Sequence, residues 1–162
     1  MNDYSEPDTH LEVQRYYGET LETTDDLKTT ACCTAAAPPA HLTRLLADIH
    51  EEYYLKACLN IIASGHMPDF QQVDDWILPE LMGDFDDWNS LVARGHEVMP
   101  HSWQHLNLAR QEPYEAKKLI SKCIVYFNEN LRGFDPSKAV FNFPFNSSTP
   151  ELDQHALTLV RA

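Results

Sequence analysis

The sequence predicts an α/β domain with parallel strands, preceded by a helical N-terminal segment. One observation is that short apolar runs, typical of buried strands, alternate with segments whose apolar residues recur every three or four positions. A second is that 43% of the 162 residues are hydrophobic, which is enough for a packed core. Both favour one domain of ordinary size with an extra N-terminal segment.

Three runs have the form of strands. Residues 55–63 (LKACLNIIA) are an apolar run closed by Ser64 and Gly65, as expected of a strand that is buried on both faces. Residues 96–99 (HEVM) are a second short candidate. Residues 139–145 (AVFNFPF) are the third, rich in the β-branched and aromatic residues that strands favour.

Four helices are predicted around these strands. The first begins near Ala40 and reaches Glu52, the second covers 86–94, and the last is short and opens at 148–151. The helix over 114–131 has the clearest 3.6-residue period. Its apolar positions are Ala116, Leu119, Ile120, Cys123, Ile124 and Phe127.

The N-terminal third is less regular. Residues 1–11 are predicted to be a frayed tail, and residues 12–30 have apolar side chains at roughly helical intervals. The stretch from Thr30 to Ala40 is rich in small residues and contains Pro38 and Pro39, so we expect a loop there.

Charge and composition exclude several classes of partner. The formal net charge is −13, from 25 acidic and 12 basic residues, so binding to nucleic acid or to an anionic membrane is not expected. No apolar run reaches the roughly 18 residues that span a bilayer, and the acidic start does not resemble a secretion signal. We therefore expect a cytoplasmic protein, which suits four cysteines without disulfide-like spacing.

The pair His101 and His105 is the first candidate site. Residues four apart share one face of a helical turn, so two imidazoles at this spacing can bind one metal ion. The pair directly follows the strand expected at 96–99, and sites in α/β folds lie at the carboxyl ends of strands.

The run from Leu91 to Leu108 (LVARGHEVMPHSWQHLNL) resembles the second motif of the NodB-type polysaccharide deacetylases. In that family a helix and the letters GHE precede a strand, and His-Ser/Thr-x-x-His follows it. The family's two histidines fall on His101 and His105, and its hydroxyl residue on Ser102. The resemblance covers roughly residues 55–162, and we take 53–162 as a truncated domain of this type.

This resemblance implies a partial, distorted (β/α) barrel and a divalent metal ion, usually zinc. His101 and His105 would be two of its ligands, and the metal would activate water for the removal of an acetyl group from an N-acetylated carbohydrate. The resemblance also implies contacts with this carbohydrate from Ser102 and Trp103, and from Asn142 and Phe145 in the later aromatic-proline-aromatic turn.

The sequence departs from the family at the other expected groups. No aspartate pair precedes the strand at 55–63, where the family has its first motif. Asp86 and Asp87 are weak catalytic candidates, because the run Asp84-Phe85-Asp86-Asp87 is better explained as a helix cap with an acidic first turn. The family's arginine position holds Asn142, and its last motifs would follow Ala162. The third ligand and the general base are therefore unassigned.

Residues 12–52 resemble a different family, the N-terminal segment of arsenite methyltransferases. The matching features are Tyr16-Tyr17-Gly18, the loop Ala31-Cys32-Cys33-Thr34 and the helix that ends in His50-Glu51-Glu52. In that family a loop cysteine binds trivalent arsenic, a role that would fall on Cys32 or Cys33. No glycine-rich loop follows a strand, so S-adenosylmethionine is not expected as a cofactor.

The two resemblances meet between Glu52 and Tyr53. They predict a helical segment over 1–52 and a deacetylase-like domain over 53–162. Three functions stay open: a metal-dependent deacetylase that lacks part of its catalytic set, an arsenite methyltransferase fragment, and a non-catalytic binding or remnant protein.

Overall fold

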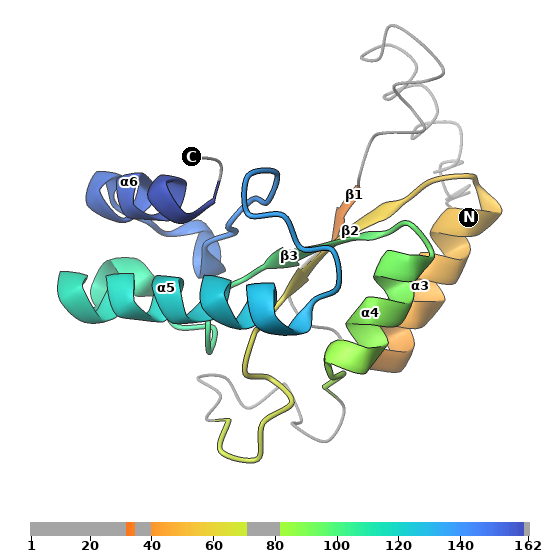
Figure 1. Ribbon diagram of the computed structural model, residues 1–162, viewed down its shortest axis with the longest axis horizontal. Coiled ribbons are helices and arrows are strands. Elements are labelled where there is room, and N and C mark those ends of the chain that lie inside the picture. Colours follow the sequence, from red (N-terminus) through yellow and green to blue (C-terminus); the bar gives the residue numbers. More distant parts are fainter. Residues whose placement is uncertain (1–31, 35–39, 71–81, 161–162) are drawn as a thin grey trace, which may run out of the picture.

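The computed structural model describes residues 32–34, 40–70 and 82–160 (Figure 1). The predicted tail, the helical segment over 12–30 and residues 71–81 lie outside these residues. The elements in chain order are β1 (Cys32–Thr34), α3 (Ala40–Glu52), β2 (Ala57–Ile61), α4 (Phe85–Ala93), β3 (Glu97–Pro100), α5 (Pro113–Asn130) and α6 (Pro150–Leu159), with single 3-10 turns at Leu108–Arg110 and Pro144–Asn146.

The strands form one small parallel sheet in the order β1-β2-β3, so the predicted α/β class is confirmed. Cys33 is paired with Cys58 and Asn60 with Met99. Every residue of β2 is buried, which explains why this central strand reads as an unbroken apolar run. With three strands, the expected barrel is seen only in part.

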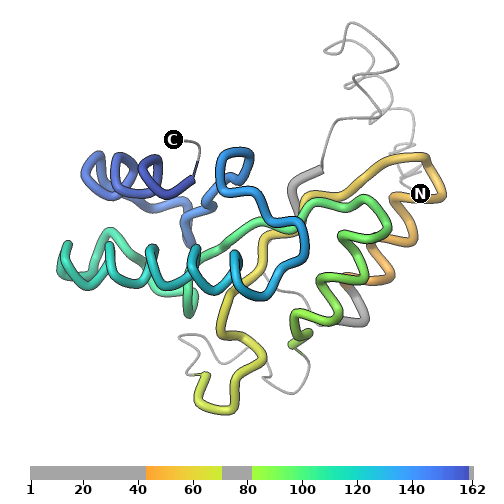
Figure 2. The backbone as a smooth tube through the Cα atoms, viewed as in Figure 1, coloured from red at the N-terminus to blue at the C-terminus, as the bar shows by residue number. Residues whose placement is uncertain are grey.

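Two pairs of helices accompany the sheet. Helices α3 and α4 contact each other and lie side by side on the right of Figure 1, whereas α5 and α6 contact each other on the left. The smooth trace in Figure 2 follows the same two pairs on either side of the strands. Between strands and helices lies a core whose most completely buried large side chains include Trp88, Phe127, Leu59, Ile61, Leu91 and Ile120.

The helix boundaries follow local chemistry. Pro113 occupies the first turn of α5, where its missing N–H costs nothing. The predicted apolar stripe of this helix is buried, with Leu119 partly so. Gly95 has a φ of 89° in the turn after α4, a conformation that glycine adopts without strain. At the start of α6, the Thr149 side chain accepts a hydrogen bond from the N–H of Leu152. None of the helices within the described ranges is both long and apolar enough to cross a membrane.

Two stretches expected as a loop and as a strand have a different structure. The stretch 30–40 was expected to be a loop, yet Cys32–Thr34 is a strand, because a short segment of no marked pattern gains its hydrogen bonds from a distant partner, β2. Residues 139–145 were expected to be a strand but are irregular and end in a 3-10 turn. Pro144 has no N–H, and the N–H of Val140 points to the thioether sulfur of Met99 at 3.5 Å rather than to a carbonyl.

Candidate functional site

The segment after β3 that carries the two histidines is a tight non-helical turn. The helical turn expected from the spacing of His101 and His105 was therefore wrong. Ser102 and His105 both have left-handed backbone conformations, with φ of 71° and 57°. The turn is attached to the continuation of β2 beyond its last strand residue. Its backbone bonds are His101 N–H to Ile61 O at 2.9 Å, Ala63 N–H to Ser102 O at 3.0 Å and Ser64 N–H to Trp103 O at 3.0 Å.

The hydroxyl of Ser102 serves the turn itself. Its Oγ accepts the backbone N–H of His105 at 3.0 Å, and the residue is 1% exposed. A left-handed conformation at a serine costs free energy, which is offset here by the hydrogen bond and by burial. Ser102 therefore shapes the turn that brings the second histidine back beside the first.

The two imidazoles are neighbours. Their ring centroids are 5.1 Å apart, and both residues are buried. The Nδ1 of His101 lies 2.9 Å from the carbonyl oxygen of Asn142. Burial, and to a lesser degree the neighbouring His105, lowers the pKa of His101 to about 4, so this imidazole is neutral at pH 7.

Phe145 lies against the second histidine. Its ring centroid is 4.9 Å from that of His105, and half of the residue is exposed. Phe145 and the following Asn146 are both left-handed, with φ of 59° and 49°. The strained turn holds an apolar ring at the solvent side of the histidine pair, in the form of an aromatic wall.

Trp103, in contrast, is packed in the interior. It is 9% exposed and meets Tyr126 edge to face at 5.4 Å between ring centroids. The Lys122 ammonium lies 3.7 Å from the centroid of the indole ring. These contacts join the turn to α5 and account for the tryptophan without a ligand, so its substrate contact stays a prediction.

The acidic run before α4 is a helix cap, as the sequence indicated. The Asp84 carboxylate accepts the N–H groups of Asp86 and Asp87, at 2.9 and 3.1 Å. In return, the Asp87 carboxylate accepts the N–H of Asp84, which completes a capping box, and it forms an ion pair with Arg44. Asp86 is exposed. These contacts give the Asp87 carboxylate a structural explanation, whereas Asp86 contributes its backbone N–H to the cap.

The donor set does not complete a three-ligand metal centre. An Nδ1–H donated to a carbonyl leaves the Nε2 lone pair of His101 for a metal ion, which suits ligation. However, no three His, Cys, Asp or Glu side chains come together as a possible metal site within the ranges that the structure describes. Catalytic zinc has three protein ligands in well-studied hydrolases, so the pair supplies part of such a site.

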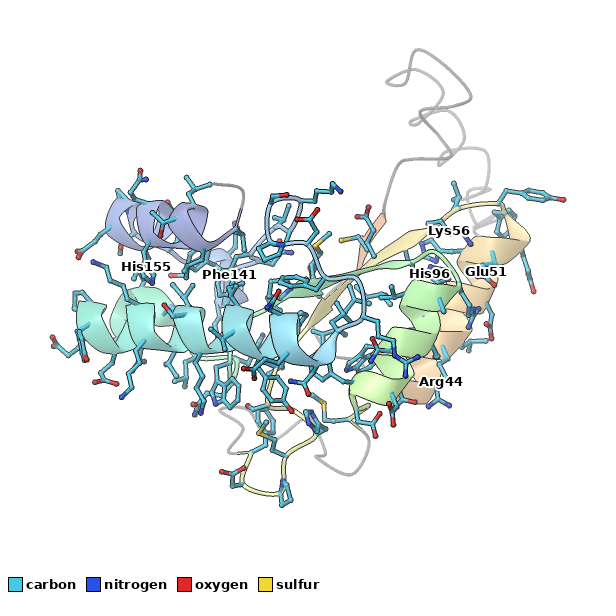
Figure 3. The ribbon with its side chains drawn as sticks, viewed as in Figure 1. Arg44, Glu51, Lys56, His96, Phe141 and His155 are labelled. Atoms are coloured by element: carbon cyan, nitrogen blue, oxygen red, sulfur yellow. The ribbon has the colours of Figure 1, made fainter. Side chains whose placement is uncertain are left out.

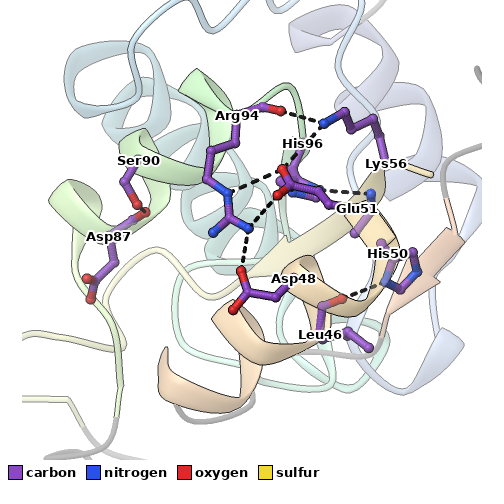
Figure 4. Close-up of polar contacts among 10 residues, drawn as sticks. Leu46, Asp48, His50, Glu51, Lys56, Asp87, Ser90, Arg94 and His96 are labelled. Carbon is purple, nitrogen blue, oxygen red and sulfur yellow. Dashed lines mark hydrogen bonds and ion pairs between the residues drawn. The ribbon is translucent and has the colours of Figure 1, made fainter. Parts of the chain in front are cut away.

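A second polar cluster, which the sequence analysis missed, lies at the opposite, amino ends of β2 and β3 (Figures 3 and 4). Glu51 on α3 accepts hydrogen bonds from Arg94 at 2.9 Å, His96 at 3.1 Å and Lys56 at 3.4 Å. Arg94 also pairs with Asp48. Chiefly because of Arg94, the pKa of Glu51 is lowered to about 2. The cluster attaches α3 to both strands.

The sequence alone offered one signal for this cluster. His96 and Glu97 match the family letters GHE, but nothing in the spacing indicated that His96 would face a carboxylate 45 residues earlier. Cys32 and Cys33 form part of β1, beside Ala57 and Cys58 of β2. The structure does not describe the side chains of Cys32 and Cys33, so their expected role in binding arsenic stays a prediction.

Comparison with solved structures identifies the architecture. The peptidoglycan deacetylase PdaC from Bacillus subtilis superposes with a TM-score of 0.58 and 21% identity, over 76% of this chain and 52% of that one. The deacetylase PplD from Streptococcus pyogenes gives 0.65 and 15%, over 92% and 59%. The fold is that of the CE4 polysaccharide deacetylases.

The CE4 fold also occurs in a protein described as a pseudoenzyme. This Bacillus anthracis protein matches with a TM-score of 0.58 and 15% identity, over 78% of this chain and 39% of that one. A mutant of it is described as having restored enzymatic activity. The present chain spans about half the length of the deacetylases it matches, and identities of 10–21% establish the fold alone.

The N-terminal resemblance is also confirmed. A stretch of 43 residues, 26% of the chain, is 51% identical to an arsenite methyltransferase from Aquipseudomonas alcaligenes, and 44 residues are 46% identical to the Mus musculus enzyme. Each match covers 12% of the relative. No protein-family model matches the chain.

Proposed function

We propose that this chain is a carbohydrate-binding domain of the deacetylase fold, with a site for N-acetylated sugars at the histidine turn and with impaired acetyl removal. The observation that carries this proposal is the incomplete donor set. His101 and His105 are built into place by Ser102 and Asn142, but no carboxylate joins them within the described ranges. Two imidazoles alone hold a divalent ion weakly.

The surroundings of the pair favour a sugar as the ligand. The half-exposed ring of Phe145 offers an apolar face beside the polar imidazole of His105. The expected sugar contact of Asn142 stays a prediction, because its side-chain amide donates a hydrogen bond to Asn60. Sites for small ligands typically combine an apolar wall with a few well-placed polar groups. The neighbours of this fold whose names state a substrate act on polysaccharides such as peptidoglycan.

The test combines binding with turnover. The full chain is titrated with chito-oligosaccharide while the NMR signals of His105 and Phe145 are followed, and acetate is assayed with zinc, cobalt or manganese added. We expect saturable shifts in the wild type. In Phe145→Ala, followed through His105, the affinity for the sugar should be at least fivefold lower. No variant or metal should give acetate above the level of His101→Ala. Metal-dependent acetate release that His101→Ala abolishes would contradict impaired catalysis. Absence of any sugar binding would contradict the site.

A second candidate function rests on the identity of 51% over 43 residues. The relatives are named arsenite methyltransferases, and thiolates are soft ligands that suit trivalent arsenic. If Cys32 or Cys33 retains this role, the full chain should bind arsenite, and Cys32→Ser or Cys33→Ser should lower the bound arsenic measured by mass spectrometry. Unchanged binding in the double variant would exclude it.

A further inference from the structure

We propose that Asn60 is a positioning residue for the histidine pair and acts through Asn142. Asn60 is the fourth of the five residues of β2, between Leu59 and Ile61, which are each 1% exposed, and is itself only 9% exposed. A buried amide in an apolar strand needs hydrogen-bond partners to offset its loss of water. This inference relies on the proposed function only in taking the histidine pair as the binding centre.

The contact that Asn60 makes is with the later segment of the chain. The Nδ2–H group of Asn142 donates a hydrogen bond to Oδ1 of Asn60, 82 residues earlier. The backbone N–H of Asn142 donates to the carbonyl of Pro100 at 3.0 Å, and its carbonyl accepts from Nδ1 of His101 at 2.9 Å. Asn142 therefore touches β2, the end of β3 and the first histidine at once.

The bond to the histidine decides how the ring can be used. A carbonyl oxygen can only accept, so it holds the proton of His101 on Nδ1 and leaves the lone pair on Nε2. Asn142 lies outside any strand, in a segment attached to β3 without a regular ladder. Its side-chain bond to Asn60 therefore has a large share in fixing where that carbonyl lies.

Two substitutions separate the hydrogen bond from packing. Asn60→Leu keeps the number and branching of the side-chain heavy atoms but removes the acceptor, whereas Asn60→Asp keeps an oxygen that accepts the Asn142 amide. The tautomer of His101 is read at pH 7 from the ring nitrogen shifts in a long-range proton–nitrogen NMR spectrum of the metal-free full chain. We expect the Nδ1–H form in the wild type and in Asn60→Asp, and a loss of at least half of it in Asn60→Leu.

Asn142→Ala provides a second route to the same result if Asn60→Leu does not fold. It deletes the amide and keeps the backbone carbonyl, so it should release the tautomer to a similar extent. An unchanged His101 tautomer in either variant would overturn the proposal. Failure of sugar binding would leave the tautomer result intact, because the spectrum is recorded without ligand.

Asn89 offers a matched control. It is equally buried at 9% exposure, donates to the carbonyl of Asn130 at 3.0 Å and accepts the N–H of Arg132 at 2.7 Å, where α4 packs beside the end of α5. Asn89→Leu should destabilise the protein without changing the His101 tautomer. If it changes the tautomer as much as Asn60→Leu does, the effect is a general loss of stability, and the positioning role is wrong.

Discussion

Glu51 accepts a hydrogen bond from Nε2 of His96 at 3.1 Å, and this contact joins the two parts of the chain that resemble different families. On its other side, Nδ1 of His96 accepts the N–H of Ala57 at 3.0 Å, so the ring is neutral with its proton on Nε2. Helix α3 is thereby attached to the amino ends of two strands. The division of the chain between residues 52 and 53 stays a prediction from the sequence. The contact between Glu51 and His96 joins the two sides of this division in the fold.

The charge of Glu51 should give the protein a pH-dependent stability. The pKa of this carboxyl is about 2 in the fold against an ordinary 4.5, so its contribution is full above pH 4.5 and is lost as the pH falls toward 2. Glu51→Gln should lower the melting temperature at pH 7, and the difference from the wild type should shrink between pH 4.5 and 2.5. Circular dichroism melts measure it.

Glu52→Gln is the control for that experiment, because Glu52 is the next residue of α3 and is exposed. It should leave the melting temperature within about a degree, as surface substitutions usually do. A Glu51→Gln difference that stays constant down to pH 2.5 would show that the lost charge is not responsible.

The capping role of Asp84 can be measured directly. Asp84→Ala leaves the N–H groups of Asp86 and Asp87 without their acceptor and should cost about 1 kcal/mol of unfolding free energy in urea titrations. Asp86→Ala removes an exposed first-turn carboxylate and should cost at most about half as much. Equal losses would contradict the capping box as the main function of this run.

The buried hydroxyl of Ser102 should contribute to the stability of the fold. Ser102→Ala removes the acceptor of the buried His105 N–H and should destabilise the fold by about 1–3 kcal/mol. Ser90→Ala, which deletes an exposed hydroxyl on α4, should stay within about 0.5 kcal/mol. Chemical unfolding compares the two, and the interpretation of Ser102 fails if they are equal.

His101 should titrate well below an ordinary histidine. Burial disfavours the imidazolium and His105 disfavours it further, so an NMR titration should give a midpoint near pH 4 rather than 6.5. Because the folded state disfavours protonation of this ring, the stability that depends on the neutral ring is complete above pH 6.5 and falls as the pH drops toward 4. The signal is assigned by its loss in His101→Gln, and a midpoint near 6.5 would contradict the buried site.

The elements with strong local patterns were predictable from the sequence. Helix α5 has a full apolar stripe and Pro113 at its start, and α4 has a capping run and a terminal glycine, so both were placed within about a residue. β1 was not predictable, since three residues carry no period and their pairing with β2 is decided by tertiary contacts. The strand predicted over 139–145 is absent although its residues favour strands. Pro144 has no N–H to donate, and the N–H of Val140 lies against the thioether of Met99 instead of a carbonyl.

The site residues, too, were predictable where their partners are close in the sequence and unpredictable where their partners are distant. The histidines were located by a motif, and the capping explanation for Asp84 and Asp87 is confirmed, because both depend on neighbours within a few positions. The interior position of Trp103 and the bond between Asn60 and Asn142 depend on groups dozens of residues apart. Spacing along the chain contains no information about such partners.

The register between β1 and β2 has a consequence for any shortened version of this protein. Cys32–Thr34 covers one hydrogen-bonding edge of β2, a strand whose five residues are all buried. A chain that begins after residue 34 would present that edge of a mostly apolar, uncharged strand to other molecules. Such edges pair with one another between copies, so the shortened protein should self-associate into aggregates although its histidine turn is untouched.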